Sequence, residues 1–179
     1  MRLIKYSSVP FLLALIVGSA LPAHADEACL DFKWDVSKER ALFAEPPAAA
    51  VAAKNPASAP IVVPNRLYAV RLAVQDHVAF SVTPGKKAPA TPAYAGLLTL
   101  KIPAAGSYRI AVDLPFWIDV VSQGVLVAAK DYQGQHACSA PHKIVEFDLA
   151  GVQPFVLQIS NAATDSVLLT VTPSPVRKF

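Results

Sequence analysis

Residues 106–114 read GSYRIAVDL, and residues 143–149 read KIVEFDL. Both stretches carry an apolar side chain at every second position. The apolar sets are Tyr108, Ile110, Val112 and Leu114 in the first stretch, and Val145, Phe147 and Leu149 in the second. Side chains of a β-strand point alternately to its two faces, so this spacing predicts strands that each bury one face.

The same period of two recurs along most of the chain after residue 66. Leu98–Ile102, Phe155–Ile159 and Val167–Val171 show it most clearly, and we expect further strands at Leu67–Val74, Val78–Val82, Trp117–Val121 and Val125–Ala129. Turn-forming residues cluster at 103–106, 122–124, 150–151 and 161–165. No crossover helix fits between these runs, which disfavours a parallel sheet. The pattern predicts an all-β, antiparallel, jelly-roll-like sandwich of eight to nine strands with a short N-terminal helix.

The first 25 residues have the layout of a secretory signal peptide. Arg2 and Lys5 precede the apolar run FLLALIV at 11–17, and Ala23-His24-Ala25 forms a small-x-small cleavage motif. A membrane-spanning helix needs about 20 apolar residues, which is more than this run provides. We therefore expect export to the periplasm, cleavage of residues 1–25, and a mature domain that is not embedded in a membrane.

Residues 26–64 differ in composition from the β-rich remainder at 65–179, which we expect to be the sandwich domain. Residues 35–44 (DVSKERALFA) predict a short helix with Asp35 as its N-cap, and the Glu39-Arg40 charges are expected on its solvated face. Pro46 ends the helix. The Ala/Pro-rich stretch from Pro46 to Pro64 predicts an extended connector on the surface.

Two cysteines, Cys29 and Cys138, are present in the whole chain, and both follow the signal peptide. In an exported protein the simplest interpretation is a disulfide that ties the start of the mature chain to a late loop. The alternative is two separate thiols, one of them reactive.

Charge and motifs exclude several functions. The chain has 16 Lys+Arg against 13 Asp+Glu, with no basic field, so we expect no nucleic-acid partner. Lys86 and Lys87 are expected in a solvated loop. Nucleophile elbows, phosphate-binding glycine loops and paired-carboxylate motifs are all missing from the sequence, which favours a non-enzymatic protein without a cofactor. An enzyme with an unrecognised site would instead need a deep pocket with converging polar groups.

Two groups of residues are candidate sites. Trp117 and Asp119 share one face of a predicted strand, as in aromatic platforms that bind sugars. The alternative is that the indole fills the core or covers a sheet edge, with Asp119 at a strand end. His136, Cys138 and His142 include the residue types that bind copper or zinc. The alternative for this second group is a disulfide loop that carries two exposed histidines.

The order of several motifs along the chain resembles a family of small uncharacterised proteobacterial periplasmic proteins. The resemblance is carried by the segments at 34–37, 94–98, 103–110, 117–121 and 142–147 together with Cys138. It implies a periplasmic β-sandwich and no particular activity. Some such proteins are labelled homogentisate dioxygenase, an enzyme that needs an iron site with two histidines and a carboxylate. His142 and Glu146 do not fit that label, because four residues on a strand span about 13 Å.

The sheet region is also similar in style to carbohydrate-binding and pre-peptidase-type modules. Together these features predict a binding or accessory module for an unknown envelope ligand or protein, which would use the loops at the sheet edges. A periplasmic copper or zinc protein using His136, Cys138 and His142 is the alternative.

Overall fold

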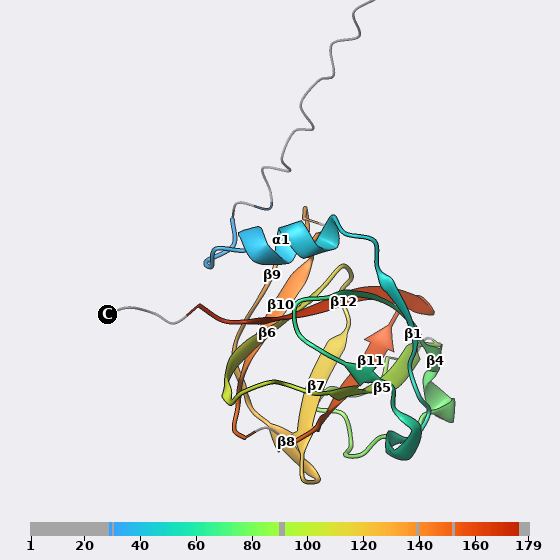
Figure 1. The fold of residues 1–179 in the computed structure, drawn as a ribbon. Coiled ribbons are helices and arrows are strands. Elements are labelled where there is room, and N and C mark those ends of the chain that lie inside the picture. Colours follow the sequence, from blue (N-terminus) through green and yellow to red (C-terminus); the bar gives the residue numbers. More distant parts are fainter. Residues whose placement is uncertain (1–28, 30, 90–91, 139, 152, 176–179) are drawn as a thin grey trace, which may run out of the picture.

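The computed structural model describes residues 29, 31–89, 92–138, 140–151 and 153–175. The predicted signal peptide at 1–25 lies outside these residues. The described chain forms two six-stranded sheets that pack face to face, with one short helix against the first sheet (Figure 1). This confirms the predicted all-β sandwich. Within the described chain, no helix has the length and apolar character needed to cross a membrane.

Each sheet mixes strands from distant parts of the sequence. The first sheet has the order β1 (Ala48–Val51), β3 (Leu67–Arg71), β12 (Ser166–Pro173), β6 (Gly106–Val112), β10 (Lys143–Leu149) and β9 (Ala129–Gly134). The second has the order β2 (Ile61–Val62), β5 (Tyr94–Leu100), β11 (Phe155–Ala162), β7 (Trp117–Ser122) and β8 (Val125–Val127), and β4 (Ala73–Val74) pairs with β5. Two short 3₁₀ helices, Pro56–Ser58 and Gln75–His77, lie between strands.

The antiparallel pairs give the topology of a jelly roll. β12 pairs with β3, β11 with β5, β10 with β6, and β8 with β7, so the second half of the chain retraces the first. This is one long hairpin folded over into two sheets, as in a jelly roll. The predicted jelly-roll-like arrangement is therefore confirmed.

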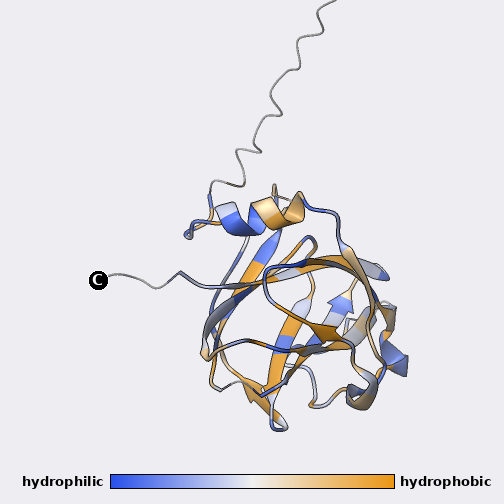
Figure 2. Cartoon of the chain, viewed as in Figure 1, coloured by the Kyte–Doolittle hydropathy of each residue, from blue (hydrophilic) through white to orange (hydrophobic). Residues whose placement is uncertain are grey.

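The core follows the predicted alternation. The apolar positions of β5, β6, β10, β11 and β12 that were expected to face inward all lie in one buried cluster between the sheets. Figure 2 shows this as hydrophobic colouring along the strands, whereas α1 is hydrophilic on one part and hydrophobic on another. Burial of the inner faces between the sheets is the main source of the sandwich's stability. The prediction that each strand buries only one face was wrong for β6 and β10, because the N-terminal segment covers their outer faces as well.

The Ala/Pro-rich stretch contributes to both sheets. It was predicted as an extended surface connector, but β1 and β2 within it pair in parallel with β3 and β5, and the 3₁₀ helix Pro56–Ser58 separates them. Residues 52–53 continue across the second sheet, and a Cβ on Gly96 would lie 2.3 Å from the Cβ of Ala52. Only glycine allows this close approach of the two backbones.

One predicted strand, Val78–Val82, is absent, and two predicted strands divide between the sheets. The segment predicted at Leu67–Val74 forms β3 in the first sheet and β4 in the second. Val78–Val82 forms no strand, because the side chain of Gln158 takes the place of a strand partner. Its Oε1 accepts the N–H groups of Ser81 and Val82 at 2.8 and 3.2 Å, and its Nε2 donates to the Val82 carbonyl at 3.0 Å. The segment predicted at Val125–Ala129 also divides, because β8 ends at Val127 and the chain then crosses to the first sheet as β9.

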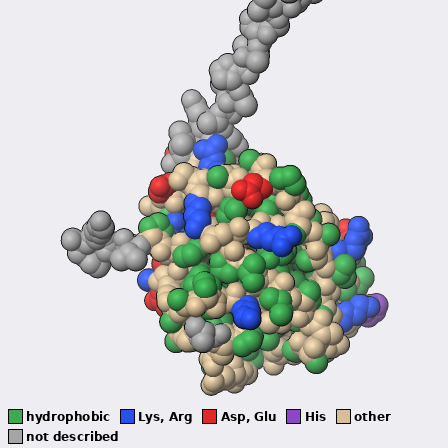
Figure 3. Space-filling view, in the orientation of Figure 1, with side chains coloured by type: hydrophobic (Ala, Val, Ile, Leu, Met, Phe, Trp, Pro, Cys, Tyr) green, Lys and Arg blue, Asp and Glu red, His purple; other side chains and the backbone are tan. Residues whose placement is uncertain are grey.

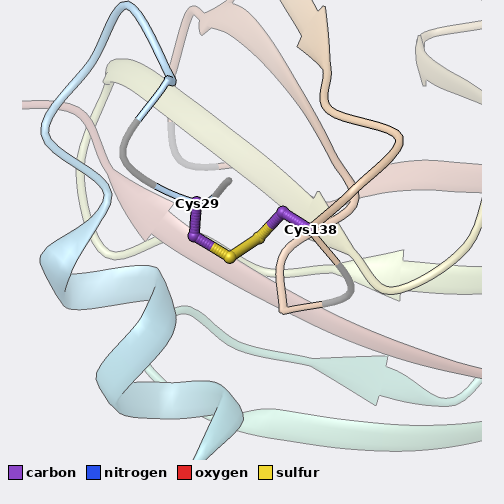
Figure 4. The surroundings of a disulfide bond; sticks show 2 residues. All are labelled: Cys29 and Cys138. Atoms are coloured by element: carbon purple, nitrogen blue, oxygen red, sulfur yellow. A yellow bond between two sulfur atoms is a disulfide. The ribbon is translucent and has the colours of Figure 1, made fainter. Parts of the chain in front are cut away.

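The N-terminal segment covers the outer face of the first sheet. The helix α1 spans Ser37–Phe43, and Asp35 Oδ1 accepts the N–H of Ser37 at 2.9 Å. A disulfide joins Cys29 to Cys138, with their Cα atoms 5.1 Å apart, and so attaches this segment to the loop between β9 and β10 (Figure 4). The predicted disulfide is confirmed. A second small core forms beneath the segment from Cys29, Phe32, Trp34, Val36, Ala111, Cys138 and Ile144.

The expected exposure of the Glu39 charge was wrong. Its side chain is 2% exposed because α1 turns it toward the sheet, where Thr172 Oγ1 donates to its Oε1 at 2.5 Å. The carboxylate also lies 3.9 Å from Nη1 of Arg109. An isolated buried charge is costly, so this ion pair explains why the sequence tolerates a charge there.

Candidate functional site

A pocket of about 500 Å³ opens at one edge of the sandwich, where β8 is too short to cover its neighbours. At this edge, the second sheet ends in β8, which pairs with Val120–Ser122 of β7 alone. The first sheet ends here in the longer strand β9, which pairs with β10. Inward-facing side chains of β7, β8 and β10 therefore line the pocket, namely Ile118, Val127, Val145 and Phe147. Leu126 and Tyr132 line its mouth and are 37% and 69% exposed.

Trp117 and Asp119, the predicted ligand pair, both line this pocket. Trp117 Nε1 donates to Asp119 Oδ1 at 2.9 Å, and the N–H of Gly85 donates to Asp119 Oδ2 at 3.0 Å. A Cβ on Gly85 would lie 3.1 Å from Asp119 Oδ1, so this loop approaches the strand closely. The structure thus brings the pair together, but Asp119 positions the indole and the loop, and both of its oxygens already accept hydrogen bonds.

Two lysines flank the indole. The amine of Lys143, from the start of β10, lies 5.4 Å from the ring centroid of Trp117, and that of Lys86 lies 5.8 Å away. Lys143 occupies the same face of β10 as Val145 and Phe147, and therefore faces the pocket. Burial lowers the pKa of Lys143 below its usual 10.5, the Lys86 charge lowers it further, and Asp119 opposes this shift.

The open edge of β7 also contributes main-chain groups. In an antiparallel ladder, alternate residues direct their N–H and C=O to the same side. Ile118 and Phe116 precede the part of the chain that pairs with β8, so their main-chain groups lie beyond the end of β8. The Phe116 carbonyl accepts a hydrogen bond from Lys143 Nζ at 2.8 Å. A lysine at such a position blocks pairing with another strand.

A larger cavity of about 910 Å³ lies on the outer face of the first sheet, beside Trp34 and Arg109. Its charged groups are bonded to one another. Arg109 Nε lies 3.2 Å from Glu146 Oε2, and Lys130 Nζ lies 3.4 Å from Glu146 Oε1. Lys33 pairs with Asp131 at 2.5 Å, and Ser174 Oγ donates to Glu146 at 2.9 Å. These contacts hold the N-terminal segment and β9 to the sheet.

The proposed metal ligands are only partly brought together. The rings of His136 and His142 lie 5.5 Å apart, edge to face, and burial lowers the pKa of His142. Cys138, however, is oxidised in the disulfide and has no thiolate to offer. Within the described residues, no group of three or more His, Cys, Asp or Glu side chains is arranged to hold a metal ion.

Exposed hydrophobic side chains also occur away from the pocket. The face in Figure 3 carries many of them below α1, interrupted by single basic side chains. Val51 and Ile61 are 70% and 62% exposed. Scattered apolar exposure is ordinary on protein surfaces, so the candidate site is defined by the concave pocket and its converging polar groups.

Sequence reasoning named Trp117 and Asp119 but missed Tyr132, Lys143 and Lys86. Tyr132 lies on β9, whose polar sequence gives no alternation. Lys143 is a strand residue whose proximity to Trp117 depends on the packing of two different sheets. Only the break after Val127, where the chain changes sheets, could have pointed to an open edge.

The fold and the pocket define a jelly-roll sandwich with one apolar, cation-flanked site. The sequence matches no protein-family model and no curated protein, and no solved structure matches the chain.

Proposed function

We propose that this protein is an exported, non-enzymatic binding module and that the pocket beside Trp117 holds its ligand. The observation that carries the proposal is the pocket itself. It is a concave, mainly apolar site with an aromatic ring fixed at its rim and few polar groups, which is typical of small-molecule sites.

The composition of the pocket supports binding rather than catalysis. Its lining contains no Ser, Cys or His, and its carboxylate, Asp119, accepts hydrogen bonds from Trp117 and Gly85. The described lining therefore offers no Ser–His or Cys–His pair, and its amine, Lys143, donates to the Phe116 carbonyl. The lining residues are Gly85, Trp117, Ile118, Asp119, Leu126, Val127, Ala128, Ala129, Tyr132, Lys143, Val145 and Phe147.

Export to the periplasm through a cleaved signal peptide is part of the proposal. The motif at residues 1–25 and the Cys29–Cys138 disulfide support it, because structural disulfides persist in oxidising compartments. Mass spectrometry of the protein from periplasmic extracts should give a chain that starts at Asp26. A full-length chain in the cytoplasmic fraction with both cysteines reduced would contradict export.

Tryptophan fluorescence tests the ligand site. The chain contains two tryptophans, so Trp34→Phe leaves Trp117 as the reporter. Trp34 is buried away from the pocket and its Nε1 makes no hydrogen bond within the described part, so phenylalanine is a conservative replacement. The neutral apolar fluorophore N-phenyl-1-naphthylamine should quench Trp117 emission saturably at one molecule per chain.

A matched pair of variants controls this experiment. In the Trp34→Phe background, Leu126→Asp places a charge at the pocket mouth and should abolish the quenching. Val51→Asp makes a similar change at an exposed valine on the opposite edge strand of the first sheet, and should leave quenching intact. Equal quenching in both variants, or none in the parent, would contradict the proposal.

A further inference from the structure

We infer that the ligand of this pocket is a single-chain amphiphile with an anionic headgroup, such as an alkyl carboxylate, whose chain lies between the sheets and whose headgroup lies between Lys86 and Lys143. This inference rests on the proposed function and specifies the chemistry of its ligand.

The interior of the pocket suits an alkyl chain. The side chains at its base, Ile118, Val145 and Phe147, belong to the buried core and are at most 5% exposed. Leu126 and Tyr132 extend this apolar surface outward to solvent. A hydrocarbon chain that covers Leu126 and Tyr132 removes apolar area from water on both molecules, and at the base it gains packing contacts.

The rim of the pocket is positively charged. The amines of Lys86 and Lys143 both lie within 6 Å of the centroid of the Trp117 ring. Burial lowers the pKa of Lys143, and the nearby Lys86 charge lowers it further. Within the described part of the chain, neither amine lies within salt-bridge distance of a carboxylate, whereas Lys33, Arg109 and Lys130 all do. Lys143 thus faces one carboxylate, Asp119, whose oxygens are already hydrogen-bonded, and Lys86 lies beside the same indole ring.

This arrangement favours an anion over the other headgroups. A cationic headgroup would be repelled by both lysines, and the cation–π positions about the indole are already taken by their amines. A sugar would need several hydrogen-bonding side chains, but the pocket lining is mainly hydrocarbon. A carboxylate would form charge-assisted hydrogen bonds with the two amines, which are stronger than neutral ones.

Three ligands with the same chain test the inference. Decanoate, 1-decanol and decyltrimethylammonium are titrated below their micellar concentrations into the Trp34→Phe protein, with Trp117 emission as the readout. Decanoate should bind about tenfold more tightly than 1-decanol, because a charge-assisted contact contributes roughly that factor. Decyltrimethylammonium should bind most weakly.

Adjacent lysines provide a matched control. Lys86→Gln should weaken decanoate binding about three- to tenfold without changing the affinity for 1-decanol. Lys87→Gln removes the neighbouring charge, which has no contact with Trp117, and should leave both affinities unchanged.

The possible failures are distinguishable. If 1-decanol and decanoate bind equally and N-phenyl-1-naphthylamine still quenches Trp117, the anionic headgroup is wrong and the proposed function stands. If none of the four compounds binds, both fail. Co-sedimentation with phosphatidylglycerol vesicles without binding of decanoate monomers would also overturn the inference, because the protein would then recognise a membrane surface.

Discussion

Arg109 and Lys143 are two partly or fully buried cations on neighbouring strands of the same sheet, and their surroundings differ. Arg109 is 6% exposed and lies opposite Glu146 in the β6–β10 register, with Nε 3.2 Å from that carboxylate. It also donates to the Asp35 carbonyl at 3.0 Å and lies under the Trp34 ring. Lys143 donates to the Phe116 carbonyl and contacts Trp117, but it has no carboxylate partner in the described chain.

The difference separates a structural charge from one available to a ligand. Arg109 neutralises two buried carboxylates and anchors the N-terminal segment, so its cavity is part of the fold. Lys143 lies beside an open apolar pocket and forms no ion pair within the described residues, although Asp119 lies near enough to favour its charged form. Removing Arg109 should therefore affect stability, whereas changes around Lys143 and Trp117 should affect binding.

The largest effect on stability should follow loss of the disulfide. The Cys29→Ala/Cys138→Ala double variant opens a loop with a sequence separation of 109 residues, which should lower the free energy of unfolding by up to about 5 kcal/mol. Urea denaturation measures the change. An unchanged midpoint would show that the N-terminal segment holds to the sheet without its covalent attachment.

Arg109→Leu should cost about 3–5 kcal/mol in the free energy of unfolding, because it leaves Glu39 and Glu146 buried without their cation. Arg71→Leu is the matched control, since Arg71 pairs with Asp165 on the surface, with side chains 68% and 51% exposed, and should cost less than about 1 kcal/mol. Similar losses in the two variants would refute the structural role of Arg109.

Trp117→Leu should lower the free energy of unfolding by about 1–3 kcal/mol, because the buried Asp119 loses the indole as a hydrogen-bond donor. It should also weaken decanoate binding about tenfold, or about 1.4 kcal/mol, because the rim loses its aromatic surface. Calorimetric titration provides the readout, since the reporter indole is gone. The Trp34→Phe protein should bind decanoate like the parent. A larger loss of binding in Trp34→Phe than in Trp117→Leu would place the site in the other cavity.

The smallest expected effect is on pH dependence. The pKa of Lys143 lies below its ordinary 10.5, so its amine loses the proton at a lower pH than a free lysine. Decanoate affinity should therefore begin to fall below pH 10.5, whereas 1-decanol affinity should hold while circular dichroism shows the protein folded. Lys86 and Asp119 act on the Lys143 amine, and Tyr132 lines the same pocket, so other groups near the ligand also titrate. The Lys143→Met variant shows which part of the fall in affinity is due to Lys143. In that variant the early part of the fall should disappear.

The sequence predicted the features that depend on local pattern. Ile110, Leu157 and Leu169 belong to apolar sets that recur at every second residue of their strands, and all three lie in the core between the sheets. Such alternation predicts which face of a strand points inward. The disulfide could also be predicted from the sequence, since a chain with two cysteines has only one way to pair them. Features that depend on long-range contacts were not predictable in this way.

Three errors show where local pattern fails. Val78–Val82 has strand-like composition, but the amide of Gln158 satisfies its main-chain groups from another strand. Glu39 was expected in solvent because the sequence does not show that Arg109 and Thr172 lie beneath the helix. The sequence predicted Trp117 and Asp119 as pocket residues but not Lys143 and Tyr132. Those two lie on strands of the other sheet and come close to Trp117 only when the sheets pack.

Amide chemical-shift mapping of the ¹⁵N-labelled mature protein during a decanoate titration tests the central claim most directly, since both cavities are observed in one experiment. We predict shifts concentrated at Ile118, Val127, Ala129 and Lys143, with the amides of Lys33, Trp34 and Arg109, which line the other cavity, unmoved. Shifts centred on the Arg109 cavity, or no shifts at saturating decanoate, would contradict the assignment of the Trp117 pocket as the ligand site.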